Sequence, residues 1–205
     1  MQYPSKLVED AVHEISKLPG IGKKTALRLS LHLLKQDPDV THRLADSLIA
    51  LREKSKNCKI CHMLSDTEEC TCENIRRDQT MICVVEDTPD LIAIQNTAQY
   101  NGYFHVLGGV ISPLEGVGPS DLHIDSLETR INQSGSQVKE IILALSPTME
   151  GDTTAFYIAK KLKNYPVKIS LIARGIPMGG ELEYTDEVTL GRSIVQRLQY
   201  NLDDM

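Results

Sequence analysis

Met81-Ile-Cys-Val-Val-Glu86, followed directly by Asp87-Thr-Pro89, is the stretch that best indicates the fold. The first five residues form a short apolar run, which is typical of a strand buried on both faces, and Thr88-Pro89 is a typical helix start. Strands that alternate with helices predict a mostly parallel sheet with helices on both faces, hence an α/β domain. Further apolar runs occur at 103–107, 141–145 and 167–173, with helical patterns near 89–100, 121–133 (expected to begin at Asp121) and 152–163.

Acidic residues follow two of these predicted strands. Glu86 closes the first strand, and Glu150 and Asp152 come after the third. Because the carboxyl ends of parallel strands gather at one edge of a sheet, the three carboxylates are expected there and could hold magnesium. The alternative is that Glu150 and Asp152 only cap the helix that follows, over 154–162.

The N-terminal third of the chain is predicted to be a small helical module. Apolar residues recur at helical spacing over 7–18, where Pro19-Gly20 ends the run, and again over 26–34. Asp37-Pro38 then indicates a cap and a first-turn proline for a third helix that reaches about Arg52. At the other end of the chain, 188–202 is expected to form a last helix that packs on this chain or on a neighbouring copy.

The turn Leu18-Pro-Gly-Ile-Gly22 lies between the first two predicted helices. Its glycines allow the backbone amides to point outward at a helix N-terminus, where they can hold a phosphate. The alternative is a tight helical hairpin with solvated lysines. A nucleotide P-loop is excluded because its spacing is absent and no strand precedes the turn. Between Ser16 and Gln36 there is no acidic residue but five basic ones, Lys17, Lys23, Lys24, Arg28 and Lys35.

Four of the five cysteines lie between 54 and 78, a polar segment without periodicity. Cys58-Lys-Ile-Cys61 and Cys70-Thr-Cys72 form two ligand pairs, as a tetrahedral zinc site with four thiolates requires. The second pair has a single spacer residue, so either it still closes around one metal or His62 replaces a thiolate. Free thiols on a loop are the alternative. The fifth, Cys83, is expected to be a buried strand residue.

The net charge of -6 hides a division along the chain. Residues 1–77 hold 13 Lys or Arg against 11 Asp or Glu, whereas 78–205 hold 9 against 17. Any DNA contact is therefore expected near the N-terminus. The sequence contains no apolar stretch that could span a bilayer and no secretory signal pattern, so a cytoplasmic, nucleoid-associated protein without a membrane partner is expected.

Several of these motifs together resemble the RecR family of bacterial recombination mediators. The glycine turn with its basic helix is similar to a helix-hairpin-helix motif, and the strand-end acids are similar to those of Toprim domains. The resemblance covers nearly the whole chain. The segments that carry it are Leu18–Gly22, the cysteine cluster with Arg76-Arg77, Ile82–Glu86, His105–Leu114, Gly116–Pro119 with Asp121-Leu122, Ala173–Pro177 and Gly179–Tyr184.

This resemblance implies an α/β protein of several modules. They are a helix-hairpin-helix module that binds DNA (1–53), a four-cysteine zinc finger (54–78), a Toprim domain (79–176) and a C-terminal loop and helix that serve oligomerisation (177–205). The implied DNA contacts are Gly20, Gly22, Lys23, Lys24 and Arg28, and the implied ligands of a structural zinc ion are Cys58, Cys61, Cys70 and Cys72.

The resemblance also implies a protein that is not an enzyme and has no catalytic residue. A homo-oligomer, a tetramer or a dimer of dimers, would encircle the DNA backbone without reading sequence. It would act with RecO and RecF to load RecA at gapped or damaged DNA. Glu86, Glu150 and Asp152 would then contact a protein partner such as RecO instead of Mg²⁺.

Two rival functions remain open at this stage. The first is a magnesium-dependent nuclease or primase of the Toprim type that uses Glu86, Glu150 and Asp152. The second is an adaptor whose acidic face binds partners while the basic helix only aids assembly. The chain has few aromatic residues, seven Tyr, two Phe and no Trp, which favours contacts with the DNA backbone over extensive stacking on bases.

Overall fold

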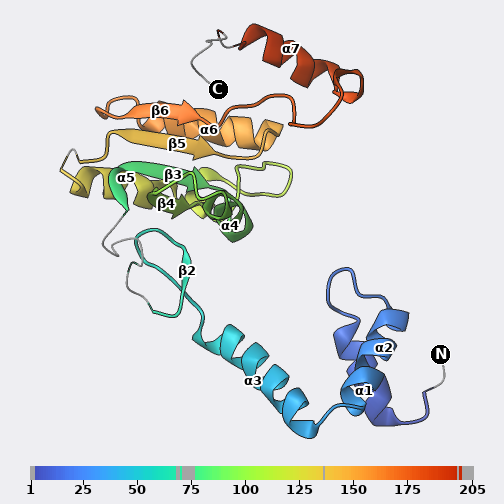
Figure 1. The fold of residues 1–205 in the computed structure, drawn as a ribbon. Helices are drawn as coiled ribbons and strands as arrows, with labels where there is room; N and C mark the ends of the chain where they lie inside the picture. The colour runs from blue at the N-terminus through green and yellow to red at the C-terminus, as the bar shows by residue number, and fades with distance from the viewer. Residues whose placement is uncertain (1–2, 68–69, 71–76, 136, 198, 200–205) are drawn as a thin grey trace. The chain divides into compact units, whose positions relative to one another are not determined.

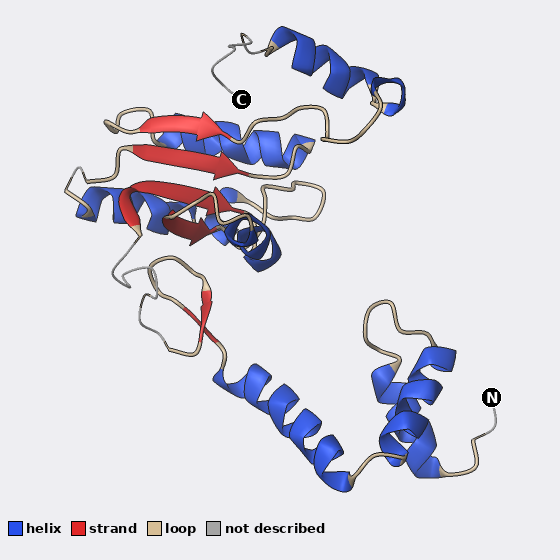
Figure 2. Ribbon diagram, in the orientation of Figure 1, coloured by secondary structure: helices blue, strands red, loops and turns tan. Residues whose placement is uncertain are grey.

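The computed structural model of the chain describes residues 3–67, 70, 77–135, 137–197 and 199, and it divides the chain into two compact units, Met1–Ser55 and Lys56–Met205 (Figure 1). The first unit is helical, and the second combines a small β-ribbon with an α/β sheet (Figure 2). The helices are α1 Lys6–Ile15, α2 Lys23–Leu34, α3 Pro38–Lys54, α4 Thr88–Asn96, α5 Ile124–Gln133, α6 Met149–Lys161 and α7 Glu187–Val195. The strands are β1 Lys56–Asn57, β2 Leu64–Ser65, β3 Asp78–Val85, β4 Gly102–Val106, β5 Glu140–Ala144 and β6 Lys168–Leu171.

The N-terminal unit is held together by one small apolar cluster. Val8 and Val12 of α1 pack against Ala26 of α2, and all three are buried. The helix starts follow their sequence signals: the Ser5 side chain accepts from Leu7 N–H, and the Asp37 side chain accepts from Asp39 N–H at 3.0 Å. The helix expected from Asp37-Pro38 is therefore confirmed, and it reaches Lys54.

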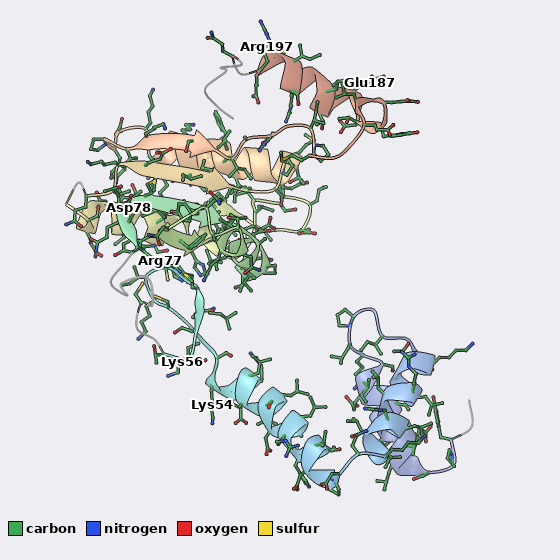
Figure 3. All side chains as sticks on the ribbon, viewed as in Figure 1. Lys54, Lys56, Arg77, Asp78, Glu187 and Arg197 are labelled. Atoms are coloured by element: carbon green, nitrogen blue, oxygen red, sulfur yellow. The ribbon has the colours of Figure 1, made fainter. Side chains whose placement is uncertain are left out.

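Helix α3 buries none of its own residues. Its 17 residues would extend for about 25 Å at the helical rise of 1.5 Å per residue. Figure 3 shows side chains projecting from all sides of it, up to Lys54 at its end. Its large apolar side chains are exposed; they are Leu44, Leu48, Ile49 and Leu51.

The second unit is built on a four-stranded sheet in the order β4-β3-β5-β6, in which every neighbouring pair is parallel. This confirms the parallel sheet predicted from the alternating pattern. The chain leaves β3 toward β4 on one side and returns to β5 on the other side of β3. The ends of β3 and β5 therefore form the switch point at which open α/β sheets bind ligands.

Both faces of the sheet are covered, as its apolar strands require. Ile82, Val84 and Leu143 point to the face covered by α5 and α6, where the larger core cluster lies. Cys83 and Val85 point to the other face, where they pack with Leu91 of α4, Phe104 and Val106. Cys83 is thus a buried strand residue, as predicted, and burial raises the pKa of its thiol to about 12.

Two helix boundaries differ from the sequence prediction. Asp121 does not begin a helix: it ends a 3-10 turn over Pro119–Asp121, and α5 starts only at Ile124. The Asp121 carboxylate instead accepts a hydrogen bond from Gly118 N–H, which closes that turn. The last helix spans Glu187–Val195 and ends at its C-cap Gln196, whereas the expected range was 188–202, of which 198 and 200–202 lie outside the described residues. Within the part of the chain that the structure describes, no helix has the length and apolar character needed to cross a membrane.

Candidate nucleic-acid interface and metal centre

The glycine turn joins α1 to α2 with an open backbone. Gly20 has φ +76°, the left-handed conformation that glycine adopts without strain, whereas Gly22 precedes α2 with an extended φ of -79°. No heavy atom beyond their chain neighbours lies within 4 Å of the position that a Cβ would take at either residue. The backbone conformation therefore favours a glycine at position 20, and the open space at 20 and 22 leaves the backbone accessible to a ligand.

One face of α2 presents basic side chains. Lys24 and Arg28 lie one turn apart, are exposed, and line a shallow groove of about 440 Å³. Lys23 is also exposed but does not line this groove. The other residues along the groove are Leu27, Leu31, His32 and Lys35. The structure thus brings Lys24 and Arg28 together on one surface next to the turn, where a phosphate backbone could contact both.

Three of the four predicted zinc ligands meet in the cysteine loop. The Sγ atoms of Cys58, Cys61 and Cys70 lie within 4.8 Å of one another, and the Cys61 and Cys70 sulfurs are 3.6 Å apart. Thiolates at about 2.3 Å from a tetrahedral zinc ion are about 3.8 Å apart, so the cluster fits this metal. Cys72, the fourth predicted ligand, lies outside the described residues. Such a centre would tie the loop together in place of an apolar core.

The backbone around Cys58 favours a thiolate. Burial alone would raise the pKa of the Cys58 thiol, but the N–H groups of Cys61 and Ile60 donate to Cys58 Sγ at 3.5 and 3.3 Å, and the net result is a lowered pKa. Because a metal ligand must be deprotonated, this arrangement favours metal binding. Cys58 and Cys61 are fully buried and lie beside Cys70, so they are not thiols exposed on an open loop.

His62 does not join the thiolates. Its Nε2 lies 2.8 Å from Ser126 Oγ, and its ring stacks on His123 with centroids 3.6 Å apart and an interplanar angle of 6°. A third ring, that of the buried His105, packs edge-on at 5.4 Å. Burial, reinforced by the neighbouring His123 and Arg130, lowers the pKa of His62 to about 4. The expectation that His62 replaces a thiolate is therefore not supported; the residue packs the cysteine loop onto α5.

The predicted Toprim acids are not assembled as a metal site. The cysteine cluster is the only group of three or more potential ligands that the described residues bring together, so Glu86, Glu150 and Asp152 do not converge. Glu150 and Asp152 lie in the first turn of α6, as the capping alternative requires, although the Thr148 side chain makes the cap by accepting from Gly151 N–H. Gly151 is needed because a Cβ there would lie 2.0 Å from Ser146 O.

Each acid at this edge has a different environment. Burial raises the pKa of Glu86, the neighbouring carboxylates of Asp90 and Asp87 raise it further, and a hydrogen bond with Ser146 opposes the shift. In contrast, Asp152 accepts from Arg174 at 2.6 Å, and this bond lowers its pKa. The edge therefore holds an ion pair supplied by the protein itself.

Sequence reasoning did not assign a role to Arg174, His105 or His123. Arg174 follows β6 and reaches the acidic edge only because β6 pairs with β5. His123 is far from the cysteine loop in sequence and contacts it only through the fold, so no local pattern could reveal it. The available signal was the position of Arg174 after the last predicted strand, where the carboxyl ends of parallel strands gather.

The structure thus combines a helical unit with a basic glycine turn, a cysteine cluster and a parallel α/β sheet domain. Three family models match in order along the chain: RecR, helix-hairpin-helix at 8–52, Toprim domain at 80–173, and RecR, C-terminal at 175–197.

Curated relatives match over nearly the full chain. Recombination protein RecR of Cytophaga hutchinsonii is 62% identical over 198 residues, covering 96% of both chains. The proteins of the same name from Amoebophilus asiaticus and Bacteroides fragilis are 60% and 58% identical, over 98% and 97% of this chain and 100% and 97% of theirs. The chain therefore belongs to the RecR family of recombination proteins.

Proposed function

We propose that this protein is a non-enzymatic recombination mediator that binds the DNA backbone through the glycine turn and α2. The observation that carries the proposal is the exposed pair Lys24 and Arg28 beside the open turn, on a segment without any acidic residue. Lys23 and the backbone amides at Gly20 and Gly22 complete the proposed contact. Backbone contacts of this kind position a protein on DNA without reading sequence.

The chain is proposed to act as an oligomer, a tetramer or a dimer of dimers, that encircles DNA. A monomer with a net charge of -6 would bind weakly, whereas several copies of one basic helix around a ring add their contacts. RecO and RecF are the proposed partners, and loading of RecA at gapped or damaged DNA is the proposed outcome. The strand-end acids Glu86 and Glu150, which Arg174 does not neutralise, are proposed to contact a partner protein.

The proposed division of labour follows four modules, with DNA binding in 1–53, a structural zinc finger in 54–78, the Toprim domain in 79–176 and oligomerisation in 177–205. The exposed apolar side chains of α7 support the last assignment, because this helix buries none of its residues; they are Val188, Ile194 and Val195. Such side chains are typical of a surface that is covered in an assembly.

Fluorescence anisotropy with gapped DNA over a salt series tests the proposal. Lys24→Glu with Arg28→Glu should abolish binding and, in any residual binding, reduce the slope of log K against log salt by roughly 0.7 to 0.9 for each phosphate that the variant no longer neutralises. Lys54→Glu with Arg52→Glu is the matched control, because it reverses one lysine and one arginine of the same unit at exposed positions in the last turn of α3, outside the glycine turn and α2.

Two results would contradict the proposal. Equal weakening of binding in both double variants would mean that only net charge matters and that α2 is not a contact surface. Cleavage or extension of the DNA in Mg²⁺, abolished in Glu86→Gln, would instead establish the rival function of a Toprim nuclease or primase.

A further inference from the structure

A polar pocket of about 380 Å³ lies in the second unit, and the proposed backbone contacts do not use it. It is formed where the cysteine loop meets β3, β4 and the end of α5. Its volume falls within the range of about 300 to 1,000 Å³ that is common for small-ligand sites. The residues that line it and enter the argument are Tyr103, Arg130, Gln79, Gln133 and Gln137.

The pocket has a flat and fixed side formed by Arg130 and Tyr103. The Arg130 guanidinium lies over the Tyr103 ring, with 5.0 Å from Cζ to the centroid, and its NH1 donates to Phe104 O at 2.7 Å. Both contacts hold the guanidinium plane in place. A planar group of this kind, fixed before a ligand arrives, is a surface on which a heteroaromatic ring can stack.

The rim of the pocket supplies neutral hydrogen-bonding groups. Gln79, Gln133 and Gln137 are exposed, and their side-chain amides make no hydrogen bond within the described part of the chain. Each amide offers both donors and an acceptor. Among the described residues, no carboxylate lines the pocket, Arg130 is its only cation, and Cys70 of the proposed zinc cluster borders it. Apart from that cysteine, the polar groups of the lining are neutral side chains and one guanidinium.

From this combination we propose that the pocket binds an unpaired nucleobase. A base has a planar ring that can stack on the guanidinium and an edge of alternating donors and acceptors that amides can recognise. The inference deepens the proposed function and rests on it: α2 would hold the DNA backbone, and this pocket would receive a base from the single-stranded part of a gap. The pocket would thereby distinguish gapped DNA from an intact duplex, whose bases are stacked and paired.

The test compares two gapped substrates with identical phosphates, one with normal bases in the gap and one with abasic sites. Anisotropy with the full-length, zinc-loaded protein should show that the normal gap binds at least about fivefold more tightly, the lower end of what one stacked base contributes. Gln133→Ala with Gln137→Ala should reduce the ratio of the two affinities toward one. The slope of log K against log salt should stay unchanged, because no charge is altered. Gln95→Ala with Gln99→Ala, two exposed glutamines at and after α4, is the matched control.

The outcomes separate this inference from the proposed function. If wild type binds both gaps equally, or if the Gln133→Ala/Gln137→Ala variant keeps the full preference, the base pocket is wrong while backbone binding stands. If Lys24→Glu/Arg28→Glu leaves the affinity for both gaps unchanged, or wild type binds neither, the proposed function fails and this inference fails with it.

Discussion

The cysteine loop and the acidic edge of the sheet both contain the residue types of a metal site, but only the loop brings them together. Three sulfurs lie within 4.8 Å of one another, and two backbone N–H groups donate to one of them. At the sheet edge the carboxylates remain apart, and Asp152 is paired with Arg174. Motif residues alone therefore do not define a metal site; the surrounding donors and counter-ions decide which of the two can bind an ion.

Disruption of the thiolate cluster is expected to have the largest effect. Cys58→Ser should remove one zinc ion per chain and destabilise the second unit by several kcal/mol, because metal binding supplies folding free energy to a loop without a core. Metal analysis of the purified protein and chelator titration measure this. Cys83→Ala is the control and should keep the zinc, since that thiol is a buried strand residue; a variant at 58 that retains full zinc would contradict the assignment.

Removing the histidine stack should have the next largest effect. His123→Ala deletes the ring on which His62 stacks and the contact of His123 Nδ1 with Val106 O at 3.1 Å, for a cost of about 1 to 2 kcal/mol. Zinc should remain bound but be transferred faster to a chelator, because the loop is held less firmly. His13→Ala, at an exposed histidine of α1, is the control. Unchanged transfer in His123→Ala would show that the stack does not support the loop.

The sequence predicted the parts of the fold whose signals are local. The apolar run ending at Val85 and the cap at Asp37 each specify an element through neighbouring residues, and both elements are present. The predicted helix start at Asp121 was wrong because its carboxylate accepts a hydrogen bond from Gly118 N–H and so closes a turn instead of capping a helix. A residue that can cap a helix or a turn does not reveal from sequence which of the two it does.

The candidate sites were predictable as ligand types but not as geometry. The spacing of Cys58 and Cys61 already indicated a metal, because two ligands on one tight turn must lie close together. Whether Glu86 and Asp152 meet depends on strand register and on Arg174, which follows a third strand. The role of His62 depends on α5, so its contact with Ser126 could not be read from the cysteine motif.

Breaking the ion pair at the sheet edge should have a small effect with a defined pH dependence. The pKa of Asp152 is lower in the folded protein than in the unfolded chain. Its contribution to stability is therefore fully present at pH values above the unfolded pKa and is lost as the pH falls through the folded pKa. Because the Asp152 side chain is 44% exposed, Asp152→Asn should lower the free energy of unfolding by less than about 1 kcal/mol at pH 7. The substitution should not change it at pH values below the folded pKa of Asp152. Thermal melts from pH 7 downward measure this, and a cost that persists at the acid end would show that the charge is not the cause.

Glu86→Gln should give the smallest effect, and its sign should be opposite. The folded pKa of Glu86 is raised, mainly by burial, so its ionisation disfavours folding once pH rises above the unfolded value. The variant should therefore be as stable as wild type at low pH and slightly more stable at pH 7, by a few tenths of a kcal/mol at most after allowance for solvent screening. Addition of Mg²⁺ should leave the melting temperature of both proteins unchanged. A rise in melting temperature with Mg²⁺ in wild type alone would show instead that the edge assembles a metal site. A bound cation would stabilise the Glu86 carboxylate, so Glu86→Gln would then lower the stability instead of raising it.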